Sequence, residues 1–318
     1  MGIGTGIGAN YSSRAIIGSF YDRLSNTNPP AWVPRIAMRF DSDQPSEDYR
    51  WLGMSPVMRE WAGGRAAQGY RTNAVTVINK IFEASVSVDM DDIRRDKTAQ
   101  FMARIDDLPG RAQQHRAKLL TDQIILGEST ACYDGQYFFD TDHSEGNSGT
   151  QDNDRVFDIS DNATGGTATA PLASTIQGAV LQAVQAILGF KDDQGEPMND
   201  TAQQFDVMVP ATFMGETIKA LTMPLIGGGD SNVLVGNQFK LTPVVNPRLT
   251  WTNKLAVFRT DGIVKPFIEQ VEQDPVIDAI AEGSEMEIKE RKHLYTVTRI
   301  GNVAFGYWQH ACLVTLQA

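Results

Sequence analysis

Two hydrophobic periods follow one another between residues 81 and 126. From Ile81 to Asp89 apolar and polar residues alternate, which is the period of a strand with one buried face. From Asp91 onward the spacing changes to steps of three and four, which is typical of an amphipathic helix. At about 1.5 Å of rise per residue the helical segment spans roughly 45 Å or more, so we expect it to support an elongated subunit. Its apolar positions are Phe101, Ile105, Leu108, Ala112, Ala117, Leu120 and Ile124.

A proline divides this helical segment. Pro109 and Gly110 predict a break near its middle, because proline lacks the amide proton of a helical hydrogen bond. We expect Asp106 or Asp107 to cap a second helix, which ends before Gly127. The sequence therefore predicts one long helical segment with a joint.

The chain before this segment divides into short pieces. Residues 11–24 predict an amphipathic helix. Residues 25–46 contain four prolines among large apolar side chains and predict an extended arm rather than a packed element. Such an arm is expected either to bind another subunit or to wrap its own chain. Residues 51–64 predict a short helix, and residues 70–78 a strand that forms a hairpin with residues 81–89.

The second half alternates helices and strands. Residues 144–171 are polar, without periodicity, and predict a long surface loop. The helices expected after it are Leu172–Phe190 and Ala211–Leu221, and the strands are Phe205–Val209, Lys240–Asn246, Leu255–Thr260, Glu287–Arg299 and Val303–Thr315. The last two strands are expected to be separated by a turn at residues 300–302. This order predicts an α+β protein.

Composition and charge argue against several classes of function. The 318 residues are 42% hydrophobic, enough for a core, and carry a net charge of −11. That charge argues against a general nucleic-acid binder, but not against a protein that encloses DNA without gripping it. Cys132 and Cys312 form no CxxC motif, which fits a reducing cytoplasm. The sequence predicts no membrane span and no signal peptide.

Candidate chemistry is sparse. The glycines near residues 2–8 and 227–229 lack the strand or the lysine that nucleotide-binding loops require. Asp140, Asp142 and His143 could offer ligands to a metal, but a turn with hydrogen-bonding aspartates is favoured. We therefore predict no catalytic residue, no cofactor and no metal. A metal-dependent hydrolase, which would need these three residues to act together, is the enzymatic alternative.

Four separated blocks resemble one family. They are WLGMSPVMREWAGG, NKIFEASVSVDMDDIRRD, CYDGQYFFDTDH and RIGNVAFGYWQHA. In this order they resemble the Mu-like phage major head subunit, or gpT, and the resemblance covers most of the chain. It implies a major capsid protein with the HK97 capsid fold.

The resemblance also implies a division of the chain. Residues 1–50 would be the N-terminal arm and residues 51–90 the extended hairpin loop. Residues 91–171 would form a peripheral domain with a long spine helix, and residues 172–285 an axial domain. Residues 286–318 would be terminal strands that return to the peripheral domain.

The implied function is structural. Members of this family assemble as pentamers and hexamers into an icosahedral shell that encloses phage double-stranded DNA. The partners implied are further copies of the chain, a scaffold, a maturation protease, a portal and a possible cement protein, without a membrane or specific DNA binding. The expected location is the virion, after synthesis in the bacterial host cytoplasm. An encapsulin-like compartment of the same fold is the alternative that encloses an enzyme cargo instead.

Aromatic and apolar residues in the arm and the loop are the candidates for contacts between subunits, because such residues dominate interface energetics. They are Phe20, Trp32, Phe40, Trp51, Met58, Trp61 and Tyr70.

Overall fold

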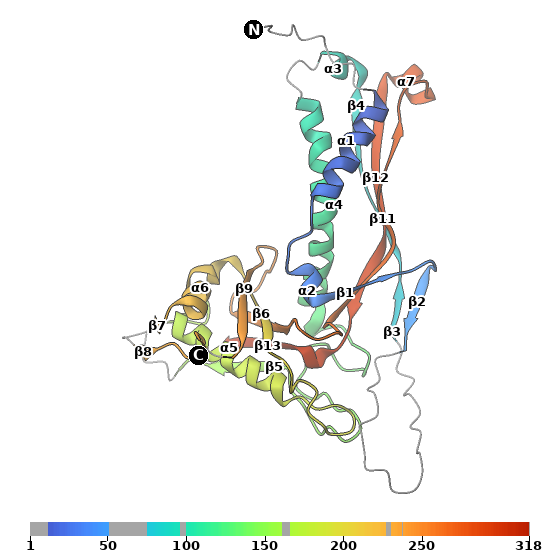
Figure 1. Ribbon diagram of the computed structural model, residues 1–318. Coiled ribbons are helices and arrows are strands. Elements are labelled where there is room, and N and C mark those ends of the chain that lie inside the picture. The colour runs from blue at the N-terminus through green and yellow to red at the C-terminus, as the bar shows by residue number, and fades with distance from the viewer. Residues whose placement is uncertain are drawn as a thin grey trace, which may run out of the picture.

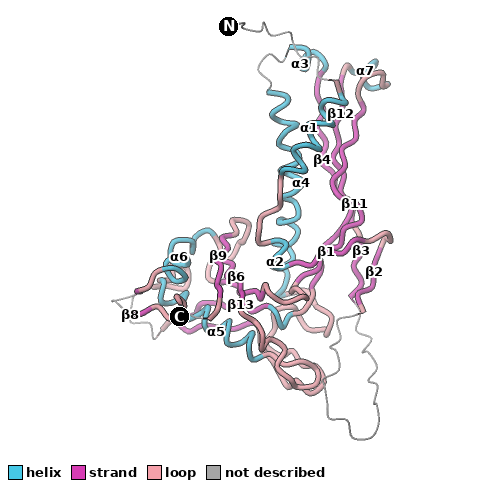
Figure 2. The backbone as a smooth tube through the Cα atoms, viewed as in Figure 1, coloured by secondary structure: helices cyan, strands magenta, loops and turns pink. Residues whose placement is uncertain are grey.

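The computed structural model describes residues 12–50, 75–95, 100–160, 166–226, 230–236 and 238–317. Figure 1 shows an elongated part, built around helix α4 and the strand pair β11–β12, which stands on a more compact lobe containing α5 and α6. Figure 2 shows that strands dominate one side of the elongated part and helices the other. We call these two parts the stalk and the lobe.

Helices and strands alternate irregularly along the chain. The helices are α1 (Ser13–Asn26), α2 (Val33–Ile36), α3 (Met90–Arg95), α4 (Gln100–Ile125), α5 (Ala173–Gly189), α6 (Met214–Thr222) and α7 (Glu285–Glu290), with short 3-10 turns η1 (Leu126–Glu128), η2 (Ala211–Phe213) and η4 (Trp308–His310). The strands are β1 (Ala37–Asp41), β2 (Ser46–Tyr49), β3 (Val75–Ile78), β4 (Lys80–Asp89), β5 (Asp154–Asp158), β6 (Gln204–Val209), β7 (Leu225–Ile226), β8 (Asp230–Ser231), β9 (Lys240–Val245), β10 (Lys254–Arg259), β11 (Phe267–Ile280), β12 (Lys292–Phe305) and β13 (Ala311–Gln317). Among the described residues, no helix is long and apolar enough to cross a membrane.

The stalk is a four-stranded sheet covered by helices. Its strand order is β1-β11-β12-β4, with β1 parallel to β11 and the other pairs antiparallel. Helices α1 and α4 pack together over one face, where Phe20 and Ile16 of α1 meet Ile105 of α4 and Tyr295 of β12. A small apolar core thus joins the N-terminal helix to the sheet.

The lobe is built around a five-stranded sheet in the order β5-β13-β10-β6-β9. Helix α5 packs against β13, β10 and β5, while α6 packs against α5 and β9. The buried positions of α5 recur at steps of three and four, as predicted, and include Ile176, Val180 and Ile187. The predicted strands at β6, β9 and β10 are likewise confirmed.

Pro109 does not break the long helix. The prediction of a joint there was wrong, because α4 runs without interruption from Gln100 to Ile125 with Pro109 inside it. Proline removes one helical hydrogen bond at a cost of about 3 kcal/mol. The apolar stripe of α4, including the fully buried Ile105 and Ile124, offsets that cost by packing against both parts of the molecule.

The predicted hairpin between β3 and β4 is also wrong. The two strands are separated by Asn79 alone, whereas the shortest common hairpin loop has two residues. Strand β3 instead pairs with β2, and β4 pairs with β12. The side-chain amide of Asn79 donates to the Gln44 carbonyl at 2.8 Å and holds the start of β2 close to this crossing.

The prediction of a turn at residues 300–302 is wrong. Strand β12 passes straight through them, and β13 joins the sheet of the lobe instead of pairing with β12. Gly301 is needed for close approach rather than for turning, because a Cβ atom there would lie 2.4 Å from the carbonyl oxygen of Gln270 on β11.

Two segments expected to be irregular contain strands. The arm was predicted to be extended and unpacked, yet β1 joins the edge of the stalk sheet. Its five residues lie between the prolines at positions 34 and 45, so all of its backbone donors are intact. Strand β5 lies inside the predicted loop 144–171 and pairs in parallel with β13. Strand β5 lies at the edge of its sheet, and its apolar and polar residues alternate only weakly. The sequence pattern therefore did not predict a strand there.

Candidate functional site

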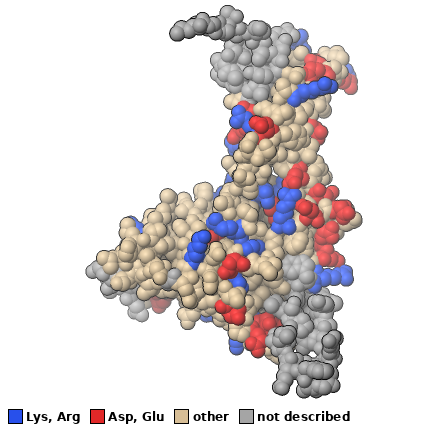
Figure 3. Space-filling view, viewed as in Figure 1, with Lys and Arg blue, Asp and Glu red and all other residues tan. Residues whose placement is uncertain are grey.

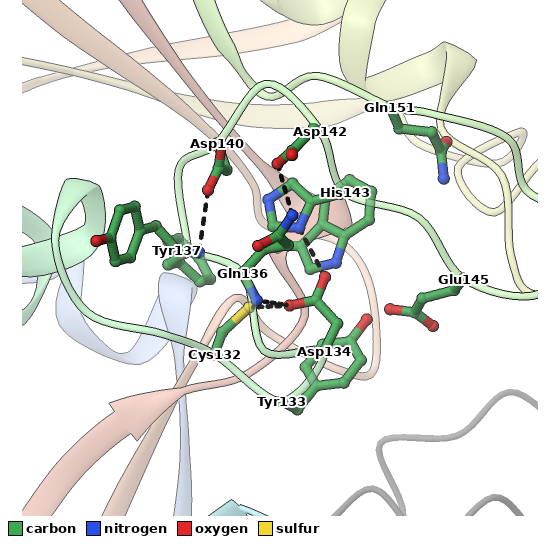
Figure 4. A network of polar contacts seen from close by, with 12 residues as sticks. Cys132, Tyr133, Asp134, Gln136, Tyr137, Asp140, Asp142, His143, Glu145 and Gln151 are labelled. Carbon is green, nitrogen blue, oxygen red and sulfur yellow. Dashed lines mark hydrogen bonds and ion pairs between the residues drawn. The ribbon is translucent and has the colours of Figure 1, made fainter.

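The aromatic, acidic turn after η1 folds around the carboxylate of Asp134. One oxygen of Asp134 lies 2.7 Å from Nδ1 of His143, and the other accepts from the thiol of Cys132 at 3.0 Å and from the backbone amide of Gln136 at 3.1 Å (Figure 4). The Asp134-Gly135 turn brings these groups together, and Gly135 takes the positive φ of 91° that glycine tolerates.

His143 ties this turn to the end of the chain. Its fully buried ring stacks on Trp308 of η4, with the centroids 3.9 Å apart and the planes 8° from parallel. Beside it, the side-chain amide of Gln309 donates to the hydroxyl of Tyr133 at 2.8 Å. The turn and η4 are therefore one packed unit, which we call the Asp134 hub.

The charges of the hub follow from burial and hydrogen bonding. Burial alone would raise the pKa of Asp134, but the hydrogen bonds from His143 and Cys132 outweigh it and hold the pKa below its usual value. Burial, followed by the nearby Asp134 charge, raises the pKa of the Cys132 thiol. This thiol is therefore protonated at neutral pH and is a poor nucleophile.

The three candidate ligands from the sequence are not brought together. Asp140 accepts from the backbone amides of its own turn, and Asp142 accepts from the side chain of Gln136 at 2.7 Å. The group with metal-compatible spacing, among the described residues, is instead Cys132, Asp134 and His143, whose donor atoms lie within 4.8 Å of one another. Because Cys132 and His143 both already bond to Asp134, this geometry supports a structural turn. It does not assemble Asp140, Asp142 and His143, the set that the hydrolase alternative would need.

Replacing Asp134 with asparagine should destabilise the subunit by about 1–3 kcal/mol at pH 7, because His143 and Cys132 lose a charged acceptor in a buried position. The pKa of Asp134 is lower in the folded state than its unfolded value of 3.8. Its charge therefore stabilises the fold above pH 3.8, and this stabilisation is lost as the pH falls through the lower folded pKa. The gap between wild type and variant should therefore close on acidification. Urea unfolding of wild type and variant at pH 7 and again below pH 3.8 measures this difference in unfolding free energy. A difference that does not change with pH would contradict the stabilising role of the Asp134 charge.

The candidate contact residues fall into three groups. Phe20 and Trp32 are buried within their own chain, Phe20 against α4 and Trp32 in the main core. For these two the arm wraps its own chain, which was one of the two alternatives for it. Phe40 is partly buried and packs against Tyr49, with ring centroids 5.2 Å apart. The remaining candidates, Trp51, Met58, Trp61 and Tyr70, lie outside the described residues.

A buried ion cluster joins α4 to the stalk sheet. Glu269 on β11 accepts from Nε of Arg116 at 2.6 Å and from Nη2 of Arg299 on β12 at 2.8 Å. The side chains of Glu269 and Arg299 are each 4% exposed. Sequence analysis missed this cluster, although Arg299 continues the inward-facing series of β12 that includes Tyr295 and Val297.

Two polar contacts connect the stalk to the lobe. Arg35 of α2 donates to the buried carboxylate of Asp206 on β6 at 2.8 Å. On α4, Thr121 accepts from the side-chain amide of Asn246, which follows β9, at 2.9 Å. These contacts join α2 and α4 to the sheet of the lobe.

Comparison with known proteins places this architecture in a family. The model of the Mu-like prophage major head subunit gpT matches residues 14–172, which is half of the chain. The Mu-like prophage FluMu major head subunit of Haemophilus influenzae is 33% identical over 148 residues, covering 46% of this chain and 47% of that protein. The major capsid protein of Escherichia phage Mu is 32% identical over 114 residues, or 36% and 37%. The matched stretch spans less than half the length of each relative.

Solved structures extend the similarity to the whole fold. The procapsid of bacteriophage JBD30 matches with a TM-score of 0.54 and 21% identity, covering 96% of this chain and 75% of that one. A virus-like particle from Pyrococcus furiosus matches with a TM-score of 0.52 and 8% identity, covering 95% and 98%. The fold is thus the HK97-type capsid fold of mixed α and β elements, as the resemblance implied. The chain belongs to the family of Mu-like prophage major head subunits gpT.

Proposed function

We propose that the protein is a major head subunit that assembles, as hexamers and pentamers of one chain, into a closed icosahedral shell around double-stranded DNA. The observation that carries this proposal is the family match to head subunits, together with the capsid fold along nearly the whole chain. Heterologous contacts between identical copies can close into such rings.

The shape of the subunit supports this role. The stalk, with its two 14-residue strands and 26-residue helix, extends well away from the lobe (Figure 1). A monomeric protein gains little from such an elongated part, since it leaves much of its surface uncovered. Subunits that overlap their neighbours in a shell can cover that surface.

The net charge of −11 supports a container rather than a DNA-binding protein. Negative charge on a surface facing packed DNA repels the phosphates and leaves the nucleic acid free to move. Figure 3 shows acidic side chains gathered over β2 and the neighbouring part of β11, with basic side chains interspersed across the middle of the molecule.

The partners and location follow from the same role. We propose that the chain meets a scaffold, a maturation protease and a portal during or after assembly, with a cement protein as an optional further partner. We also propose that it is made in the bacterial host cytoplasm and ends in the virion. We further propose that it is not an enzyme. The Asp134 hub supports this last point, because its carboxylate is occupied by three hydrogen bonds and its thiol is protonated.

We keep the domain division as part of the proposal, with two adjustments. Strand β11 lies within residues 172–285, assigned to the axial domain, yet it pairs with β1 and β12 of the stalk. Its pairing favours a boundary near Pro266. Strand β13 pairs within the lobe, so the terminal residues 286–318 are shared between the two parts. The candidates that we retain for contacts between subunits are the partly buried Phe40 and the residues outside the described ranges, Trp51, Met58, Trp61 and Tyr70.

Negative-stain electron microscopy tests the proposal directly. The chain is expressed alone and together with its neighbouring scaffold gene. We expect closed shells, or sheets and tubes with a hexameric lattice, in at least one of the two preparations. A monodisperse small oligomer in both would overturn the proposal.

A second candidate is an encapsulin-like compartment. The similarity to the virus-like particle from Pyrococcus furiosus, which covers 98% of that chain, concerns the fold alone and favours neither cargo. Shells purified from the native host distinguish the two: packaged double-stranded DNA supports the head subunit, whereas a protein cargo without DNA supports the compartment.

A further inference from the structure

A small open cavity lies between helix α4 and the sheet of the stalk. It measures about 200 Å³, and its apolar lining comes from Phe82, Ala84, Leu108, Ala112 and Val297. An apolar cavity of about 150 Å³ can hold one benzene molecule. The space therefore suits a compact apolar group of one ring with a small substituent. We call it the stalk cavity.

The wall of the stalk cavity contains a buried positive charge. Arg299 of β12 lines the cavity with its side chain only 4% exposed, and its Nη2 atom donates to Glu269 at 2.8 Å. Arg116 donates to the same carboxylate through Nε at 2.6 Å. Within the described residues, the Nε and Nη1 atoms of Arg299 have no hydrogen-bond partner. One carboxylate thus serves two guanidinium groups, and the unpaired N–H groups of Arg299 favour a further anionic acceptor.

Among the described residues, the other ionisable groups that line the cavity do not supply that acceptor. Arg111 is 70% exposed, and its Nε donates to Asp107 at 2.8 Å. Glu83 is exposed on β4, and an exposed carboxylate contributes little to an ion pair. Burial, followed by the charge of Arg299, lowers the pKa of His115, so its ring is neutral at pH 7. The uncompensated charge of the cavity is therefore that of Arg299.

The apolar lining and the buried charge together select a class of ligand. An inorganic anion such as sulfate loses its hydration water on entry and gains little from apolar walls, whereas a neutral hydrocarbon leaves the guanidinium unpaired. A carboxylate on a compact apolar body satisfies both parts of the cavity. Its hydrogen bond to a guanidinium is assisted by charge and is stronger than one between neutral groups.

We propose that the stalk cavity binds a small monocarboxylate with a ring or a branched hydrocarbon body, whose carboxylate accepts from an N–H group of Arg299 that Glu269 leaves unpaired. The apolar body lies between Leu108 and Ala112 of α4 and Val297 of β12. Such a ligand bridges the long helix and the sheet, and it stabilises the stalk because it binds only the folded state. The inference concerns the single subunit and does not rest on the proposed shell function.

Thermal unfolding of the unassembled subunit tests the proposal. Benzoate, cyclohexanecarboxylate and isovalerate are titrated at pH 7 and constant ionic strength, beside the alcohols of the same shape and beside acetate and sulfate. We expect at least one of the three acids to raise the unfolding midpoint by about 2–4 °C at ten times its Kd, which the titration itself yields. At the same concentration the alcohols, acetate and sulfate should each shift the midpoint by less than about 1 °C.

Ala112→Leu is the variant that tests the location, because its larger side chain fills the cavity from α4 and leaves the ion cluster around Glu269 unchanged. The acid that stabilises the wild type should bind this variant at least tenfold more weakly. Ala103→Leu makes the same change at an exposed position of α4 outside the cavity, and its Kd should stay within about twofold of the wild type. Unfolding midpoints without ligand check that both variants fold.

Nuclear magnetic resonance locates the ligand without any variant. Nuclear Overhauser effects from the ligand's hydrocarbon protons to the methyl groups of Ala84 and Val297 are expected, since both residues line the cavity. The proposal is overturned if none of the three acids stabilises the subunit, if an alcohol stabilises it equally, or if the contacts lie elsewhere. A Kd that Ala112→Leu leaves unchanged would overturn it as well. None of these results bears on particle formation, which electron microscopy tests separately.

Discussion

Glu269→Ala should destabilise the unassembled subunit by about 3–5 kcal/mol, because it leaves the buried Arg299 and the half-buried Arg116 without their shared carboxylate. Arg299 is 4% exposed, so its guanidinium would lose its charged partner while it stays largely removed from water. Burial already lowers the pKa of Arg299, and the Glu269 charge is the main influence that opposes this. Denaturant unfolding followed by tryptophan fluorescence measures the change.

Glu272→Ala is the matched control for this variant. Glu272 lies on the same strand but is exposed, and its replacement should change the unfolding free energy by less than about 0.5 kcal/mol. If both variants unfold at the wild-type midpoint, the buried cluster does not stabilise the stalk.

Phe20→Ala should also cost about 3–5 kcal/mol of unfolding free energy, since the side chain is fully buried and its removal leaves a cavity. Phe20 packs with Ile105 and Leu108 of α4 and with Tyr295 of β12. The sequence alone suggested it as a contact between subunits. The structure instead gives it an intramolecular role, so the defect should appear in the isolated subunit before any assembly.

Tyr21→Ala is the control that separates a role in subunit stability from a role in contacts between subunits. Tyr21 follows Phe20 on α1 but is 42% exposed, so its loss should change stability by less than about 1 kcal/mol. A Phe20→Ala subunit with wild-type stability that fails to assemble would restore the original interpretation of Phe20 as an interface residue.

The elements predicted well are those whose signal is local. Helix α5 carries a regular apolar period and strand β6 is a short apolar run, and the structure has both close to the expected bounds. Pro109 misled the prediction because intrinsic propensity is weaker than the tertiary packing of α4 on two cores. Gly301 led to a wrong prediction for a different reason. Glycine occurs both in turns and where two backbones approach closely, and only the position of Gln270 in the fold distinguishes the two cases.

The candidate site was predictable in part. The Asp134-Gly135 turn and the hydrogen-bonding role of the aspartates follow from local sequence, and both are present. The partners that complete the hub were not predictable, because Trp308 and Gln309 come from the far end of the chain. The stalk sheet likewise depends on the pairing of β4 with β12, which local periodicity does not specify.

The pairing of β1 with β11 brings Ala37 beside Phe267, residues near opposite ends of the chain. A chain still on the ribosome cannot form this pair until β11 has been made, and sheets that depend on such distant contacts close slowly. A truncated chain that ends before β11 thus lacks the finished stalk sheet. Under the proposed shell function, this order of events would keep unfinished translation products, which lack the stalk sheet, out of the particle.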